Sequence, residues 1–164
     1  MSIQFSVDEI FDMAERIERN GAKFYRRAAE IAPEEEHQKL LLRLAAMEDA
    51  HEQVFVVLRA DLPEAARTPV SSDAADERAA QVQAMADAHV FDVDADLAAR
   101  LEGKETMAAI IEMAIGIEKD TVVFYVGMRD MVPVDLGRDR VEDIIQAEMS
   151  HIAILSNQLS SLGE

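Results

Sequence analysis

The sequence predicts an all-α protein, folded as a four-helix bundle of two duplicated helical hairpins joined by a long crossover. Three observations lead to this fold class. Glycine and proline are scarce, with 6 and 4 copies in 164 residues, while the strong helix formers Ala, Leu, Met, Glu and Arg fill long stretches. Apolar residues recur at helical spacing. The two halves of the chain also repeat one another.

The repeat relates the halves at an offset of 100 residues. Its matches include residue types that are rare in this chain, so chance similarity is a poor explanation and duplication of one hairpin is indicated. The matched residues of the first half are Ile10, Met13, Ala14, Ile17, Glu18, Phe24, Tyr25, Pro33, Glu48 and His51, and their counterparts are Ile110, Met113, Ala114, Ile117, Glu118, Phe124, Tyr125, Pro133, Glu148 and His151.

The first hairpin is expected over about residues 6–62, just before a proline. Ser6 and Glu9 have the spacing of a capping box, which starts a helix, and Pro33 ends that helix. A second helix is expected from about Glu34, because the acidic residues that follow it suit the positive end of a helix. The hairpin therefore consists of two antiparallel helices with a short connection.

The crossover is expected over about residues 62–103, where prolines and serines favour a loop. Within it, an alanine-rich helix is expected from about Asp73 to His89, and a short helix after Asp94. The second hairpin is expected over about residues 104–162. Its helices should span about 104–131 and 134–162, and each of the four main helices should have roughly 25–28 residues.

The composition limits the possible functions. The length fits a single domain, and 16 basic against 33 acidic residues give a charge of 16 − 33 = −17. This charge argues against nucleic-acid binding, which needs a basic surface, and is compatible with metal cations as partners. The absence of cysteine excludes disulfides, iron–sulfur clusters and thiolate metal sites. No apolar run approaches about 18 residues and residues 1–6 lack a leader pattern, so no membrane association and a cytoplasmic location are expected.

Polar residues interrupt the apolar stripe of every main helix. Burying one unpaired carboxylate costs several kcal/mol, so four would exceed a typical stability of about 5–15 kcal/mol. Protonation or a hydrogen-bonded network could offset this cost, but two divalent cations also balance the four negative charges. Carboxylate and imidazole ligands suit iron, manganese and zinc. The six residues concerned, which include two Glu-x-x-His motifs, are Glu18, Glu48, His51, Glu118, Glu148 and His151.

These motifs, together with the two Phe-Tyr pairs, resemble the ferritin-like superfamily, and specifically the rubrerythrin-like di-iron carboxylate proteins. The resemblance covers both hairpins but not the crossover. It implies that all six residues are metal ligands, with Glu48 and Glu148 bridging or chelating and each histidine bound to one metal. It further implies that Tyr25 and Tyr125 donate hydrogen bonds to ligand carboxylates, and Glu15 could act as an additional outer carboxylate.

The chain departs from rubrerythrins in two respects. It has no cysteine-rich rubredoxin domain, so a separate electron donor is expected. It also lacks the extra glutamate that rubrerythrins carry near the ligand on the third helix. The resemblance implies a homo-oligomeric di-iron oxidoreductase of oxidative stress, which oxidises Fe(II) with dioxygen or hydrogen peroxide as a ferroxidase or peroxidase.

Two other functions remain open. One is non-catalytic binding or storage of two metal ions, iron or zinc, and the other is a regulatory or structural bundle with a vestigial site. Among the remaining polar residues, His37 is interpreted as solvated. The acidic residues Asp92, Asp94 and Asp96 are likewise interpreted as solvated, with a role in iron uptake as the alternative.

Overall fold

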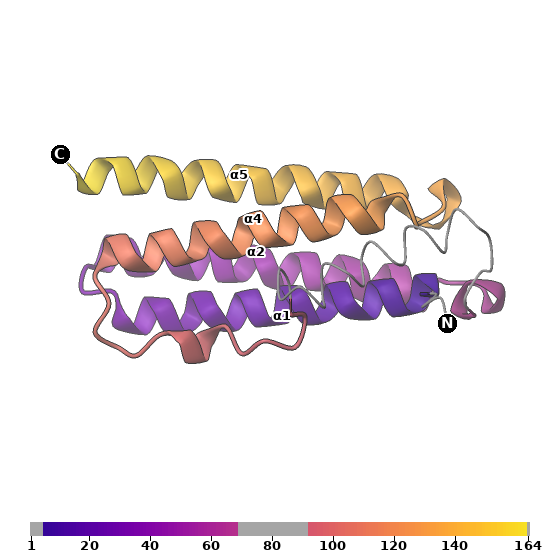
Figure 1. Cartoon of the computed structure of the whole chain (residues 1–164), viewed down its shortest axis with the longest axis horizontal. Coiled ribbons are helices and arrows are strands. Elements are labelled where there is room, and N and C mark those ends of the chain that lie inside the picture. The colour runs from indigo at the N-terminus through magenta and orange to yellow at the C-terminus, as the bar shows by residue number, and fades with distance from the viewer. Residues whose placement is uncertain (1–4, 69–91, 164) are drawn as a thin grey trace.

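Four long helices lie side by side in the computed structural model, which describes residues 5–68 and 92–163 (Figure 1). The first pair, α1 and α2, packs as one antiparallel hairpin, and α4 and α5 form the other. No strand occurs in these residues, so the predicted all-α bundle of two hairpins is confirmed. The helices span Val7–Ile31 (α1), Glu35–Ala60 (α2), Met107–Arg129 (α4) and Arg138–Leu162 (α5).

The ends of the first hairpin follow from local sequence signals. The backbone N–H of Glu9 donates to Oγ of Ser6 at 3.1 Å, and Ser6 N–H donates to Oε2 of Glu9 at 2.8 Å. The predicted capping box is therefore present. The first helix ends at Ile31, two residues before Pro33, whose ring is incompatible with a continuing helix.

The second hairpin starts each of its helices later than predicted. The helix α4 begins at Met107 because Thr106 caps it, accepting the backbone N–H of Ala109 at 3.2 Å, and at 23 residues it is shorter than expected. The last helix begins at Arg138 and not near Val134. A short 3₁₀ turn precedes it, and Gly137 then adopts a φ of 110°, which breaks the helical path.

The crossover is described only at its two ends. A 3₁₀ helix, η1 at Glu64–Arg67, follows α2, and η2 at Ala98–Arg100 is the short helix expected after Asp94. The helix expected over residues 73–89 lies outside the described residues. No helix in the described ranges has both the length and the apolar character to cross a membrane.

The apolar core is divided into two clusters along the bundle. One contains Phe11, Phe55 and Tyr125, and the other contains Tyr25 and Leu44. On each helix, the buried glutamate lies between residues of the two clusters. Apolar packing therefore closes the bundle on both sides of a polar layer in its middle.

Gly137 provides a test of the turn that positions α5. A Cβ there would lie 2.7 Å from Cδ2 of Leu58, and the positive φ strains any L-residue. Gly137→Ala should therefore lower the free energy of unfolding by about 1–2 kcal/mol, measured by urea denaturation. The control Gly116→Ala meets no atom within 4 Å in mid-helix and should raise it by about 0.5–1 kcal/mol. Equal effects of the two changes would contradict this account of the turn.

Candidate metal centre

Six polar side chains from four helices converge in the middle of the bundle. The four glutamates and His151 are each at most 4% exposed, and the side chain of His51 is 12% exposed. No lysine or arginine among the described residues forms an ion pair with these carboxylates, whose basic neighbours are the two imidazoles. The six residues are Glu18 of α1, Glu48 and His51 of α2, Glu118 of α4, and Glu148 and His151 of α5.

The imidazole nitrogens each approach several carboxylate oxygens. Nδ1 of His51 lies 2.7 Å from Oε1 of Glu148 and 3.4 Å from Oε2 of Glu18. Nδ1 of His151 lies 2.9 Å from Oε2 of Glu148 and 3.2 Å from Oε1 of Glu48. A ring nitrogen has one proton or one lone pair, so it cannot satisfy all of these oxygens.

These short distances do not amount to good hydrogen bonds. Within the described residues, both Glu148 oxygens, Oε1 of Glu48, Oε2 of Glu18 and Nδ1 of both histidines lack a partner of acceptable hydrogen-bond geometry. A buried polar atom without a partner costs about 1–3 kcal/mol. These atoms are thus close together without forming hydrogen bonds to one another, an arrangement that a bound cation would stabilise.

The donor atoms divide into two overlapping groups of four. Within each group, one ligand atom per residue lies within 4.8 Å of all the others. Oxygen and nitrogen ligands bind iron-like metals at about 2.0–2.2 Å, so ligands on opposite sides of one ion are separated by about 4 Å. Each group therefore fits one ion after small adjustments. The groups are Glu18, Glu48, His51 and Glu148, and Glu48, Glu118, Glu148 and His151.

Two buried tyrosines connect the hairpins at this centre. The hydroxyl of Tyr25 on α1 donates to Oε1 of Glu118 on α4, and the hydroxyl of Tyr125 on α4 donates to Oε1 of Glu18 on α1. Burial and the nearby carboxylates raise the pKa of both tyrosines well above 10, so the phenols stay protonated as donors. Each phenol orients the carboxylate that it contacts.

Burial makes three of the carboxyl groups weak acids in the absence of metal. Burial, reinforced by the charge of Glu148, raises the pKa of Glu48 well above its ordinary value. Burial also raises the pKa of Glu18 and raises that of Glu118 to about 8. Burial would raise the pKa of Glu148 as well, but the two adjacent imidazoles lower it to about 2.

In the two histidines, burial and the neighbouring carboxylates have opposite effects on the pKa. Burial would lower their pKa, but the carboxylates of Glu148 and Glu18 raise the pKa of His51 to about 9. Glu118 and Glu148 similarly raise the pKa of His151 to about 12. Without metal, the cluster thus retains protons at neutral pH, and a bound cation must displace them.

A glycine leaves room for one of the shared glutamates. A Cβ at Gly21 of α1 would lie 2.8 Å from Oε2 of Glu48, so a side chain there would displace that carboxylate. The duplicated position on α4 holds Thr121, which is 4% exposed. The sequence repeat contains this exchange of glycine for threonine, but only the structure shows which carboxylate it affects.

Two other residues differ from the six in their surroundings. Glu15 belongs to neither group, and its Oε1 lies 3.5 Å from Nη1 of Arg59, which also pairs with Asp8 and Asp12.

The expectation that His37 is solvated was wrong, because it is 5% exposed. Its Nε2 lies 3.2 Å from Nε2 of Gln158 across the end of the bundle, where α5 covers the start of α2.

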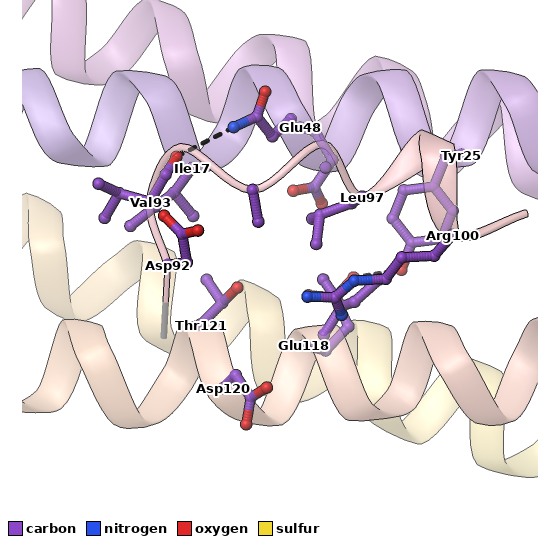
Figure 2. Close-up of a pocket in the computed structure, with 14 residues that line it drawn as sticks. Ile17, Tyr25, Glu48, Asp92, Val93, Leu97, Arg100, Glu118, Asp120 and Thr121 are labelled. Carbon is purple, nitrogen blue, oxygen red and sulfur yellow. Dashed lines mark hydrogen bonds between the residues drawn. The ribbon is translucent and has the colours of Figure 1, made fainter. Parts of the chain in front are cut away.

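Most of the residues that line a pocket reaching the cluster could not be predicted from the sequence. The pocket has a volume of about 340 Å³ and lies between α1, α4 and the segment 92–100 (Figure 2). Thr121 and Asp120 of α4 and Arg100 of the segment contribute to its lining. No periodicity could place them together, because the fold of the crossover determines which residues cover the bundle.

Comparison with known proteins agrees with this geometry. The family model described as Rubrerythrin matches residues 9–159. A solved structure described as a ferritin-like diiron-carboxylate protein from Thermotoga maritima has 24% sequence identity and a TM-score of 0.74, with 96% of each chain covered. This likeness shows a common fold. No curated protein matches the chain.

Removing a tyrosine hydroxyl tests the orientation of the ligands. Tyr25→Phe leaves Oε1 of Glu118 without its donor, and Tyr125→Phe does the same to Glu18. Each change should weaken metal affinity about 10- to 100-fold, as measured by competition with a coloured chelator. Phe124→Leu, which alters the core but no hydroxyl, is the comparison. Wild-type affinity in both tyrosine variants would rule out this orienting role.

The pKa shifts predict how pH affects the metal-free protein. Raised values at both histidines and at Glu18, Glu48 and Glu118 mean that the folded chain holds more protons than the unfolded chain. The stability from the histidines is complete below about pH 6.5 and is lost as pH rises through about 9 and 12. The three carboxyl groups likewise lower the stability of the folded chain as the pH rises above about 4.5. The Tm of chelator-treated protein should therefore fall from pH 5 to pH 9.

A variant separates this effect from general charge repulsion. Glu48→Gln replaces the carboxyl by a neutral amide, so its metal-free Tm should fall less steeply over the same range. Its Tm at pH 8 should exceed that of the metal-free wild type, although metal binding is lost. Parallel pH profiles for the two proteins would show that the cluster does not control the pH dependence.

Proposed function

The chain belongs to the rubrerythrin family, and from this premise we propose that it is a di-iron oxidoreductase that oxidises Fe(II) with dioxygen or hydrogen peroxide. One observation carries the proposal above all. Two four-residue donor groups overlap in a buried layer and share Glu48 and Glu148. Two groups with two members in common are what a pair of adjacent metal ions requires.

Each metal ion has its own pair of ligands in this proposal. Glu18 and His51 would hold one ion, Glu118 and His151 would hold the other, and the shared glutamates would bridge or chelate. Four carboxylates balance the charge of two divalent cations, so the layer becomes electrically neutral when both bind. Neutral imidazoles complete the donor set, which suits iron, with manganese or zinc as alternatives.

The bound metals would supply the electrons and the open coordination positions for the oxidant. The chain's own residues would prepare the site for this chemistry. The phenols of Tyr25 and Tyr125 hold the two unshared carboxylates in position and keep their protons. The apolar clusters on both sides limit the access of water. Gly21 leaves the space that Oε2 of Glu48 occupies, so this carboxylate would keep its position in the metal site.

Further components of the proposal come from the sequence. The chain contains no cysteine, so electrons for repeated turnover would come from a separate donor. A homo-oligomer and a role in oxidative stress are proposed from the family resemblance, and a cytoplasmic location is proposed as the default for this sequence. Dioxygen or hydrogen peroxide is the proposed oxidant. Non-catalytic storage of iron or zinc is the alternative to turnover.

Metal loading followed by oxidation tests the proposal. Anaerobic titration of metal-free protein with Fe(II) should saturate at about two ions per chain. Adding hydrogen peroxide should then consume Fe(II), measured with a ferrous chelator in quenched samples, and a chemical reductant should restore it. Glu48→Ala should abolish both binding and oxidation. The control Glu112→Ala, at an exposed position of α4, should leave both unchanged.

The outcomes distinguish the alternatives. Two bound Fe(II) ions that peroxide and dioxygen leave unoxidised would support storage and contradict the oxidoreductase. Wild-type protein that binds no Fe(II), or Glu48→Ala protein with unchanged metal content, would contradict every metal function. A thermal stability that rises on loading in the wild type and in Glu112→Ala, but not in Glu48→Ala, would support binding of the ions in the folded bundle.

A further inference from the structure

The pocket between α1, α4 and the segment 92–100 opens onto one side of the cluster. Glu48 and Glu118 line it at depth, at 4% and 2% exposure, while Asp92 and Asp120 line it and are exposed at its mouth (Figure 2). The other four cluster residues do not line it. Two further surface pockets on α2 and α5 contain none of the six. This pocket therefore provides a described path from solvent to the buried carboxylates.

The mouth of this pocket has the charge of a cation site. Asp92 and Asp120 line the pocket together with a single arginine, Arg100, so these residues give the rim one excess negative charge. Among the described residues, Arg100 forms no ion pair with Asp92 or Asp120. Thr121, one turn from Glu118 on the same helix, adds a hydroxyl oxygen between mouth and cluster (Figure 2). Oxygen donors thus occur at successive depths.

A second observation shows that the pocket leads to a buried carboxylate that lacks a hydrogen-bond partner. Glu48 is only 4% exposed, and its Oε1 has no hydrogen-bond partner of acceptable geometry among the described residues. Its other oxygen, Oε2, lies where a Cβ of Gly21 would approach to 2.8 Å, and Gly21 also lines the pocket. The missing side chain at this position therefore keeps the inner end of the path open to the carboxylate.

The segment that forms the outer wall is fixed to α1 by two specific contacts. The side-chain amide of Asn20 donates to the backbone carbonyl of Val93 at 3.0 Å, and Nη1 of Arg16 contacts Oδ1 of Asp94 at 2.7 Å. The aspartates of this segment therefore have different surroundings. Asp94 is held by an arginine, and Asp96 caps the backbone N–H of Ala99 at 3.2 Å. Asp92 accepts the backbone N–H of Asp94 and also lines the pocket.

We propose that this pocket is the route by which divalent metal ions reach the cluster, with Asp92 and Asp120 as the carboxylates that attract and transiently bind them at the mouth. The inference rests on the proposed metal-binding function. Carboxylates at the rim of a low-dielectric pocket raise the local concentration of cations and increase their association rate. They do not contact the final site, so they should affect the rate of loading and leave the occupied site unchanged.

Stopped-flow loading with Co(II) alone tests the route. Co(II) is stable in air, prefers a similar donor set to Fe(II), and changes its visible absorption when bound. Metal-free wild type is compared with Asp92→Asn/Asp120→Asn, which removes two charges and keeps an oxygen acceptor at each position. The matched control is Asp139→Asn/Asp143→Asn, which makes the same charge change at exposed positions of α5 outside the pocket.

The pocket variant should load about three- to tenfold more slowly than the control variant, with a shallower dependence of the rate on NaCl. Its final spectrum and its stoichiometry should equal those of the wild type. Asp120→Glu, which keeps the charge, should load within about twofold of the wild-type rate. Equal rates and equal salt dependence in the two double variants would overturn the proposed route. Wild-type protein that binds no Co(II) at all would instead overturn the proposed function on which the route depends.

Discussion

Four carboxylates enclosed in the interior of a helical bundle are the constraint on which the rest of this structure depends. In water each is a stable anion, but in a buried layer each anion costs several kcal/mol unless it takes up a proton or a positive charge compensates it. The described residues place no lysine or arginine against them, and two imidazoles cannot satisfy four carboxylates. Metal cations would remove this conflict, because they would supply the missing charge and could bind the oxygens that lack hydrogen bonds.

Several other features follow from the same constraint. Two phenols fix the unshared carboxylates, and each reaches across from the opposite hairpin, so the two halves are joined at the centre. The apolar side chains are concentrated in two clusters that flank the polar layer. The duplication is not complete, because Gly21 on α1 corresponds to Thr121 on α4. Both residues line the pocket, so the two hairpins differ from one another where the cluster is closest to solvent.

Much of the fold could be predicted from the sequence because its signals are local or repeated. The capping box of Ser6 and Glu9, the prolines and the 100-residue repeat define the hairpins without tertiary information. The convergence of Glu48 with His151, or of Glu18 with His51, follows once four apolar stripes share one interior. The start of α5 could not be predicted, since it depends on the backbone conformation of Gly137. The burial of His37 depends on the helix that happens to cover it.

The central claim is that two metal ions occupy the layer between Glu48 and Glu148. Anomalous diffraction at the iron absorption edge, from crystals grown with Fe(II) under anaerobic conditions, tests it most directly. The result expected is a pair of anomalous peaks about 3.5–4 Å apart, each within bonding distance of both shared glutamates and of one histidine. Iron found only on the acidic surface, with the six side chains unchanged around a metal-free interior, would contradict the claim.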